Sequence, residues 1–155
     1  VMSSALPPSP GRSSIHASTV LVGDAGILIR GASGCGKSSL ALALVTLAQG
    51  QKRFARLVCD DRTVLEVHHG RLLAGGLVAT AGLVERRGLG LVPVAHEPRA
   101  IIRLVVDCLG AEPQRMPEPE ALVTELCRLI LPRIAVHGRR GDAELVLAAL
   151  DLFRP

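Results

Sequence analysis

GASGCGKS, residues 31–38, fits the phosphate-loop pattern G-x-x-x-x-G-K-[ST]. In this pattern the glycines allow backbone N–H groups to point at phosphate oxygens, which a Cβ atom would obstruct. The lysine reaches the β- and γ-phosphates, the serine hydroxyl ligates Mg²⁺, and the next helix directs its positive end at the anion. The sequence therefore predicts a nucleotide-phosphate site formed by Gly31, Ala32, Ser33, Gly34, Cys35, Gly36, Lys37, Ser38 and Ser39.

The segments on both sides of the loop have the character that a phosphate loop requires. Apolar and β-branched residues predict strands over 19–22 and 27–30, joined by a turn at 23–26. Residues 38–48 are rich in leucine and alanine and predict a helix that ends near Gly50. A chance glycine turn needs neither the strand before it nor the helix after it, so we favour the phosphate loop.

The remaining pattern mixes short strands with helices and predicts an α/β fold with a mixed sheet. Strands are expected at residues 56–59, 63–67, 71–74 and 101–109, and a mobile or closely packed glycine-rich loop at 75–82. We expect an amphipathic helix over 118–131 with one apolar face: Leu122, Leu126, Leu129 and Ile130. Asp142 is expected to cap a last helix, which has Leu145, Ala149 and Leu152 on one face.

Length and composition indicate a single domain. A chain of 155 residues with 48% hydrophobic residues can bury a substantial core. We expect residues 1–14 to be a flexible lead-in and residues 15–155 to form a P-loop catalytic domain. The start carries no secretory signal, and the longest uncharged stretches are too short to span a bilayer, so no membrane partner is expected.

The residue counts also argue against other classes of function. With no Trp, no Tyr and two Phe, the chain lacks the aromatic platforms on which RNA or single-stranded DNA stacks. Its net charge of +4 is spread along the chain, so no nucleic-acid partner is expected. The four cysteines form no C-x-x-C pair, which indicates reduced thiols in a cytoplasmic protein.

Three further groups of residues have side chains suited to catalysis or ligand binding, and each also has a purely structural interpretation. Asp60 and Asp61 follow the strand at 56–59, where nucleotide-binding sheets place a metal ligand or a base, although solvated acids in a turn are the alternative. Adjacent carboxylates on a strand point to opposite sides, so we expect different partners for them. Residues 85–91 (ERRGLGL) offer Glu and Arg to metal and phosphate or form an ordinary charged turn, and His16 alone favours a structural role.

The order of these pieces resembles the HPr kinase/phosphorylase family, bacterial enzymes that phosphorylate a serine of the phosphotransfer protein HPr. The matching stretches are IH at 15–16, GASGCGKSSLALAL from residue 31, LVCDDR from 57 and ERRGLGLVPV from 85. The resemblance covers residues 15–153 and is most specific in RGLG, the family's signature. It implies a P-loop fold similar to the nucleotide-binding core of phosphoenolpyruvate carboxykinases.

The resemblance also implies catalytic roles for five residues: Asp60, Asp61, His16, Arg87 and Arg140. Asp60 matches the family's catalytic carboxylate, which takes the proton from the attacking serine hydroxyl. Asp61 matches the neighbour of that carboxylate, and His16 matches a histidine placed near it. Phosphoryl transfer depends on positioning, charge neutralisation and a placed base, so this assignment agrees with the chemistry.

Metal and phosphate roles follow from the same resemblance. Ser38 and Glu85 match groups near the metal, and Arg87 matches the signature arginine. Residues 136–141 match the family's late loop loosely, and Arg140 is the best match to its last arginine, which is thought to sense phosphate and partner. This departure bears mainly on the phosphorylase half of the activity.

As a whole, the resemblance implies an ATP- and Mg²⁺-dependent kinase of HPr or an HPr-like phosphocarrier. The reverse reaction would be phosphorolysis of phosphoserine-HPr by inorganic phosphate, which yields pyrophosphate. The resemblance also implies a cytoplasmic homo-oligomer, a hexamer in many members, and the short form of alphaproteobacteria without a separate N-terminal domain. Two alternatives stay open: a non-catalytic nucleotide-sensing module, which needs no base, and a small-molecule P-loop kinase, which needs an acceptor pocket.

Overall fold

The structure is a computed structural model, and it describes residues 11–154. Its helices and strands, in chain order, are β1 Arg12–Val22, β2 Ala25–Gly31, α1 Lys37–Gly50, β3 Ala55–Cys59, β4 Arg62–His68, β5 Arg71–Gly75, β6 Leu83–Arg86, β7 Gly90–Pro93, β8 Arg99–Cys108, β9 Val123–Leu126, β10 Leu129–Val136 and α2 Ala143–Leu152. The first strand begins ahead of Ile15, so residues 12–14 of the expected lead-in are part of the sheet. Residues 1–10 of that lead-in lie outside the described part.

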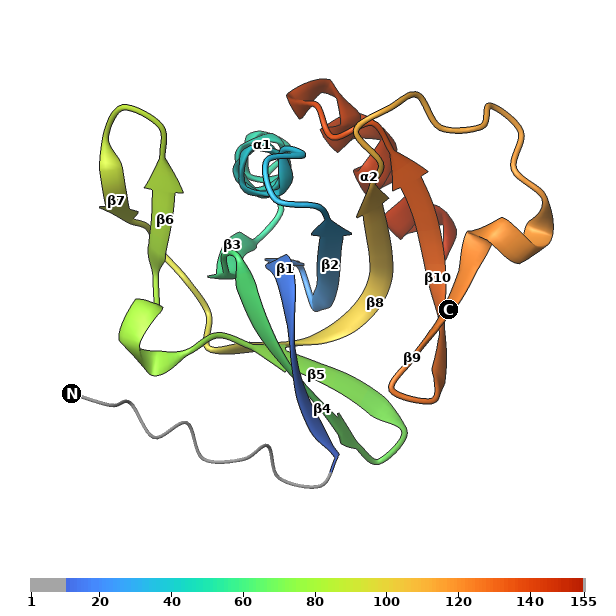
Figure 1. The fold of residues 1–155 in the computed structure, drawn as a ribbon, viewed down its shortest axis with the longest axis horizontal. Coiled ribbons are helices and arrows are strands. Elements are labelled where there is room, and N and C mark those ends of the chain that lie inside the picture. Colours follow the sequence, from blue (N-terminus) through green and yellow to red (C-terminus); the bar gives the residue numbers. More distant parts are fainter. Residues whose placement is uncertain (1–10, 155) are drawn as a thin grey trace.

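Eight strands form one strongly curved sheet, and the two long strands β1 and β8 run through both of its halves (Figure 1). The first half of β1 pairs with β4, and its second half pairs with β2 and β3. In the same way β8 pairs first with β5 and then with β2 and β10. The β2–β8 and β8–β10 pairs are parallel and the others in this body are antiparallel, which confirms the expected mixed α/β sheet.

The core has two layers, one on each side of the strands β1, β2 and β8. Helices α1 and α2 cover one face and bury residues such as Ile27, Leu44 and Val146 against it. The other face packs on the β4–β5 hairpin through Leu28, Leu65 and neighbouring side chains. Within residues 11–154, no helix is both long enough and apolar enough to cross a membrane.

The prediction of a helix over residues 118–131 is wrong. A short 3₁₀ turn, η2 (Pro119–Leu122), leads into the antiparallel hairpin β9–β10. Cys127 and Arg128 form its two-residue turn with φ angles of 51° and 65°, as the left-handed hairpin turn requires. Leucines at this spacing fit a helix face, but β10 gains backbone hydrogen bonds to both β8 and β9, and this tertiary pairing overrides the local pattern.

Asp107 on β8 binds one arginine from β2 and one from β10, which holds the β9–β10 hairpin region against the sheet. Arg30 Nε and Nη2 donate to its two carboxylate oxygens at 2.8 and 2.9 Å, and Arg133 Nε donates to Oδ2 at 2.8 Å. The same two guanidinium groups also bond Thr124 Oγ1 and the Ala121 carbonyl. Burial alone would raise the pKa of Asp107, but the hydrogen bonds and charges of the two arginines outweigh it and hold the pKa below its usual value.

The last helix exists as predicted, but only part of its predicted face is buried. Ala149 is buried as expected, together with Val146, Leu147 and Leu150, whereas Leu145 and Leu152 are exposed. The Asp142 carboxylate accepts hydrogen bonds from the backbone N–H groups of Gly138 and Arg139, and makes no side-chain cap bond to α2. It thus stabilises the loop before the helix, which lies against the phosphate loop.

Candidate active site

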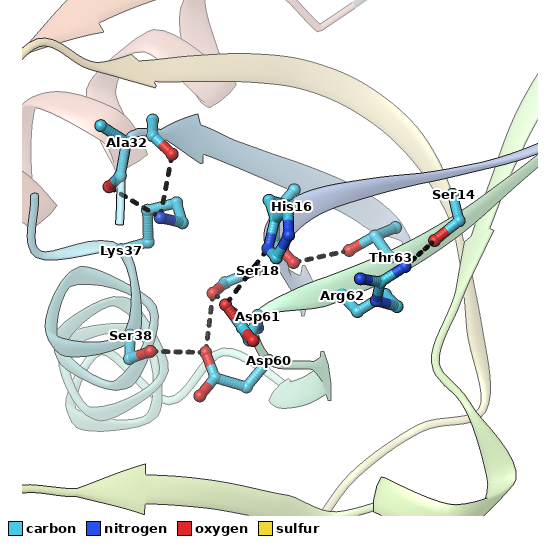
Figure 2. A network of polar contacts seen from close by, with 12 residues as sticks. Ser14, His16, Ser18, Ala32, Lys37, Ser38, Asp60, Asp61, Arg62 and Thr63 are labelled. Atoms are coloured by element: carbon cyan, nitrogen blue, oxygen red, sulfur yellow. Dashed lines mark hydrogen bonds and ion pairs between the residues drawn. The ribbon is translucent and has the colours of Figure 1, made fainter. Parts of the chain in front are cut away.

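The phosphate loop runs from the end of β2 to the start of α1, as the motif requires. Lys37 Nζ donates hydrogen bonds to the carbonyl oxygens of Gly31 and Ala32 at 2.9 and 3.0 Å (Figure 2). The lysine is only 7% exposed, so its ammonium group is held within the loop rather than in solvent. The first turn of α1, which follows, directs its unpaired N–H groups toward the same place.

A second loop packs backbone to backbone against the phosphate loop. Gly36 has a φ angle of 99°, and a Cβ atom there would collide with the carbonyl oxygen of Gly138. Gly138 has a φ angle of 114°, and a Cβ atom there would collide with the Cys35 carbonyl oxygen. Both positions therefore require glycine for conformation and for space, and together they bring Arg140 beside the site.

Asp60 is the carboxylate that faces the loop. It follows β3, and its Oδ1 accepts hydrogen bonds from Ser38 Oγ and Ser18 Oγ, each at 2.7 Å (Figure 2). Ser38 comes from α1 and Ser18 from β1, so three elements converge on one oxygen atom. A carboxylate held this way, next to a phosphate site, can accept a proton or help to hold a metal ion.

Asp61 points elsewhere, because it lies in the turn between β3 and β4 with a left-handed backbone conformation. Its φ angle is 66°, and its Oδ1 lies 3.6 Å from His16 Nδ1. Both side chains are mostly exposed, at 75% and 67% for the aspartate and the histidine. The pair therefore forms the outer rim of the site, beside Asp60 but separate from its hydroxyl contacts.

The ERRGLGL segment forms the hairpin β6–β7, which stands apart from the main sheets and lies beside α1 (Figure 1). Between this hairpin and α1 lies a cavity of about 230 Å³ lined by Ser38, Ser39, Leu42, Thr46, Glu85, Arg86, Arg87 and Arg140. Glu85 and the arginines belong to its exposed wall. The structure thus brings the predicted metal and phosphate residues to one cavity, although the sequence separates them widely.

The residues fit a metal that is held mainly by phosphate oxygens and water. Within the described part of the chain, no three His, Cys, Asp or Glu side chains gather into a metal site of their own. Ser38 donates its proton to Asp60, which leaves the hydroxyl lone pairs available to a hard cation. Mg²⁺ commonly keeps few protein ligands and several waters, so Ser38 and one carboxylate are a sufficient protein set.

Burial raises the pKa of two cysteine thiols near the site, Cys108 and Cys59. Burial and the neighbouring Cys35 thiol raise the pKa of Cys108 to about 12. Burial likewise raises the pKa of Cys59, next to Asp60. These thiols stay protonated at neutral pH and add no negative charge to a site that must receive phosphate.

Ser18 is a site residue that the sequence analysis missed. It is fully buried, and its hydroxyl contacts Asp60 directly. The signal was present: His16 and Ser18 are two residues apart on one strand, so they face the same side. A strand that carries a candidate site histidine therefore also points the next alternate residue toward the site.

Comparisons with known proteins agree with this geometry. The family model of the HPr Serine kinase C-terminal domain matches residues 10–97. An HPr kinase/phosphorylase from Lactobacillus acidophilus is 29% identical over 154 residues, covering 90% of this chain and 46% of that protein. One from Clostridium tetani is 41% identical over 80 residues, which are 52% of this chain and 24% of that protein. The chain therefore spans about half the length, or less, of the curated relatives it matches.

A solved structure shows the same fold. The Hpr(Ser) kinase/phosphatase from Coxiella burnetii superposes with a TM-score of 0.72 at 22% identity, over 90% of this chain and 95% of that one. The family model covers more than half of the chain and includes His16, the phosphate loop, Asp60 and the β6–β7 hairpin. The chain belongs to the HPr serine kinase C-terminal domain family.

Proposed function

We propose that this domain transfers the γ-phosphoryl group of ATP, with Mg²⁺, to a serine hydroxyl of HPr or an HPr-like phosphocarrier. The observation that carries the proposal is the position of Asp60: its carboxylate is hydrogen bonded to the phosphate-loop residue Ser38, so base and donor site adjoin. A module that only senses nucleotide needs no carboxylate at this place. Family membership and the names of the relatives support the same reaction.

Different side chains have different roles in an in-line phosphoryl transfer. The loop N–H groups and Lys37 hold the β- and γ-phosphates, and Asp60 takes the proton from the serine oxygen as that oxygen attacks phosphorus. Arg87 and Arg140, which line the cavity next to Ser38, neutralise charge on the transferred group. Bound Mg²⁺ supplies further charge neutralisation, with Ser38 and Glu85 as the residues that would hold it.

A protein acceptor is favoured by the surface around the cavity. Leu89 and Leu91 are 74% and 66% exposed, and they lie on the β6–β7 hairpin, whose Glu85 and Arg87 line the cavity. Exposed apolar side chains on an element that borders a catalytic cavity are typical of a protein-binding surface. A small-molecule kinase would instead enclose its acceptor, whereas this cavity is walled by exposed arginines.

The reverse reaction and the assembly are further parts of the proposal. Inorganic phosphate in the place of the β-phosphate would attack the phosphorus atom of phosphoserine. The new P–O bond forms pyrophosphate, and the serine oxygen leaves with the proton of a protonated Asp60. We propose Arg140 for recognition of that phosphate because it lines the cavity beside Ser38. A cytoplasmic location is proposed from the cysteine pattern and the resemblance. A homo-oligomer, hexameric in many members of the resembled family, is proposed on the resemblance alone.

The test is a phosphoryl-transfer assay. Purified protein is mixed with Mg²⁺, ATP and HPr from the same organism, and mass spectrometry locates any phosphate on HPr. Phosphoserine on HPr is the expected result. Nucleotide binding without transfer would favour a sensing module, and phosphate on an added small metabolite instead of HPr would favour a small-molecule kinase. Addition of inorganic phosphate to phosphoserine-HPr, with detection of pyrophosphate, tests the reverse reaction separately.

A further inference from the structure

We propose that Ser18 is a positioning residue that fixes the orientation of the Asp60 carboxylate, so that Oδ2 is the oxygen presented to the acceptor serine. This inference rests on the proposed function, because it concerns the same base. It goes beyond it by assigning a residue outside the phosphate loop and by distinguishing the two carboxylate oxygens.

The backbone of Ser18 is fixed by its place in the sheet. It lies in the second half of β1, where its register partner on β2 is Ile29 and the adjacent Thr19 is paired with Cys59 of β3. Its side chain is 0% exposed, so water cannot replace a lost hydrogen bond. The hydroxyl position is therefore set by strand pairing on both sides rather than by a flexible loop.

The direction of each hydrogen bond follows from the atoms present. Asp61 N is an obligate donor, and it lies 3.4 Å from Ser18 Oγ, which accepts. The single hydroxyl proton of Ser18 then goes to Asp60 Oδ1 at 2.7 Å. Ser18 thus bonds both aspartates and fixes the turn between them, with its only proton committed to Asp60.

The two oxygens of Asp60 have unequal surroundings. Oδ1 receives two short hydroxyl bonds, from Ser18 and Ser38. Oδ2 accepts no hydrogen bond from any residue between 11 and 154, and Figure 2 shows it pointing away from both hydroxyls. The lone pairs of Oδ1 are occupied, so Oδ2 is the oxygen able to take a proton from an incoming hydroxyl.

Ser18 and Ser38 differ in what else they do. Ser38 belongs to the phosphate loop, so a substitution there changes nucleotide and metal binding as well. Ser18 lies on another element and touches only the two aspartates with its hydroxyl. A substitution at Ser18 therefore changes the contacts of Asp60 and of the Asp61 backbone and leaves the phosphate loop intact.

The experiment compares three variants at this position with a control on the same strand. Ser18→Ala removes the hydroxyl, and Ser18→Thr and Ser18→Val are a matched pair in shape that differ only in having it. Thr19→Val is the control, because Thr19 is also fully buried but its hydroxyl contacts Thr63 and not Asp60. Urea unfolding identifies any variant that fails to fold, in which case the threonine–valine pair carries the comparison.

We expect Ser18→Ala and Ser18→Val to lower kcat for HPr phosphorylation about tenfold, the size of one charge-assisted hydrogen bond. The KM for ATP and the affinity for a fluorescent ATP analogue should stay near wild type, and Ser18→Thr should restore most of kcat. Crystal structures of Ser18→Ala should show Asp60 in a second side-chain orientation, whereas Thr19→Val should not.

Three results would overturn the proposal: unchanged kcat in Ser18→Val, an equal loss of kcat in Thr19→Val, or an unmoved Asp60 in the Ser18→Ala crystals. Failure of the proposed function gives a different result, namely wild-type protein that transfers no phosphate to HPr. The crystallographic comparison then still decides whether Ser18 orients Asp60, since it needs no turnover.

Discussion

Asp60 and Asp107 are both partly buried carboxylates at strand ends, yet their partners are of opposite kinds. Asp107 is bound by two arginines that occupy both of its oxygens. Asp60 is bound by two neutral hydroxyls that occupy one oxygen and leave the other open. A carboxylate whose charge is fully compensated can only hold structure together, whereas one that is oriented but not neutralised remains able to react.

The largest expected effect is the loss of phosphoryl transfer when Asp60, the reactive carboxylate, is substituted. Asp60→Asn keeps the size of the side chain but removes the base, so we expect phosphoryl transfer to HPr to fall about a thousandfold. Nucleotide affinity and the free energy of unfolding should change little, because the phosphate loop is intact. The measurements are the rate of phosphoserine formation, titration with a fluorescent ATP analogue and urea unfolding. Transfer at the wild-type rate would remove Asp60 from the mechanism.

We expect the opposite result for Asp107, the structural carboxylate: a loss of stability with little loss of activity. Asp107→Ala leaves Arg30 and Arg133 facing each other without a counter-charge, which should lower the free energy of unfolding by about 3 kcal/mol. At temperatures where the variant is folded, kcat for HPr phosphorylation should be close to wild type. Urea unfolding measures the first effect and the transfer assay the second. A large loss of kcat with normal stability would mean that the two carboxylates are not separate in function.

The two arginines also predict how stability depends on pH. The pKa of Asp107 is lower in the folded protein than its value of about 3.9 in an unfolded chain. The native state therefore binds fewer protons, so the stabilisation is complete above about pH 4 and is lost as pH falls through the lowered folded pKa. Urea midpoints between neutral and acid pH should fall more steeply for wild type than for Asp107→Asn. Parallel curves for the two proteins would contradict the assignment.

The smallest effect is expected for a third carboxylate, Asp151, which one arginine also binds through two hydrogen bonds but at the solvent-exposed surface. Arg53 donates to both oxygens of Asp151 at 3.1 and 2.8 Å, and the aspartate side chain is 53% exposed. Asp151→Asn should lower the free energy of unfolding by only about 0.5 kcal/mol, and high salt should reduce that difference further. A loss as large as that of Asp107→Ala would show that geometry, not burial, sets the strength of these pairs.

Local patterns account for the parts of the fold that the sequence predicted well. The phosphate loop, the strand before it and the helix after it are contiguous, and the carboxylate of Asp60 ends the next strand, so each can be inferred within a short window. Different partners were expected for Asp60 and Asp61, and the structure gives them different partners, but the turn at Asp61 rather than strand alternation sets their directions. The family resemblance added Glu85, Arg87 and Arg140, which the residues alone indicated only weakly.

The parts that failed depend on pairing between distant segments. The leucines of residues 118–131 suit a helix or a hairpin, and only the open edge of β8 makes the hairpin the better choice. The partners of Asp107 are Arg30 and Arg133, which no local pattern connects. Ser18 was missed for the same reason, because its importance comes from Asp60, which lies far along the chain.

The contact between Gly36 and Gly138 affects the order in which the protein is completed during synthesis. The phosphate loop is translated well before residue 138, yet the backbone of residue 138 is one of its walls. A nascent chain still lacking that residue has the motif but not the finished loop. Nucleotide binding during translation should therefore begin only after residue 138 has emerged from the ribosome.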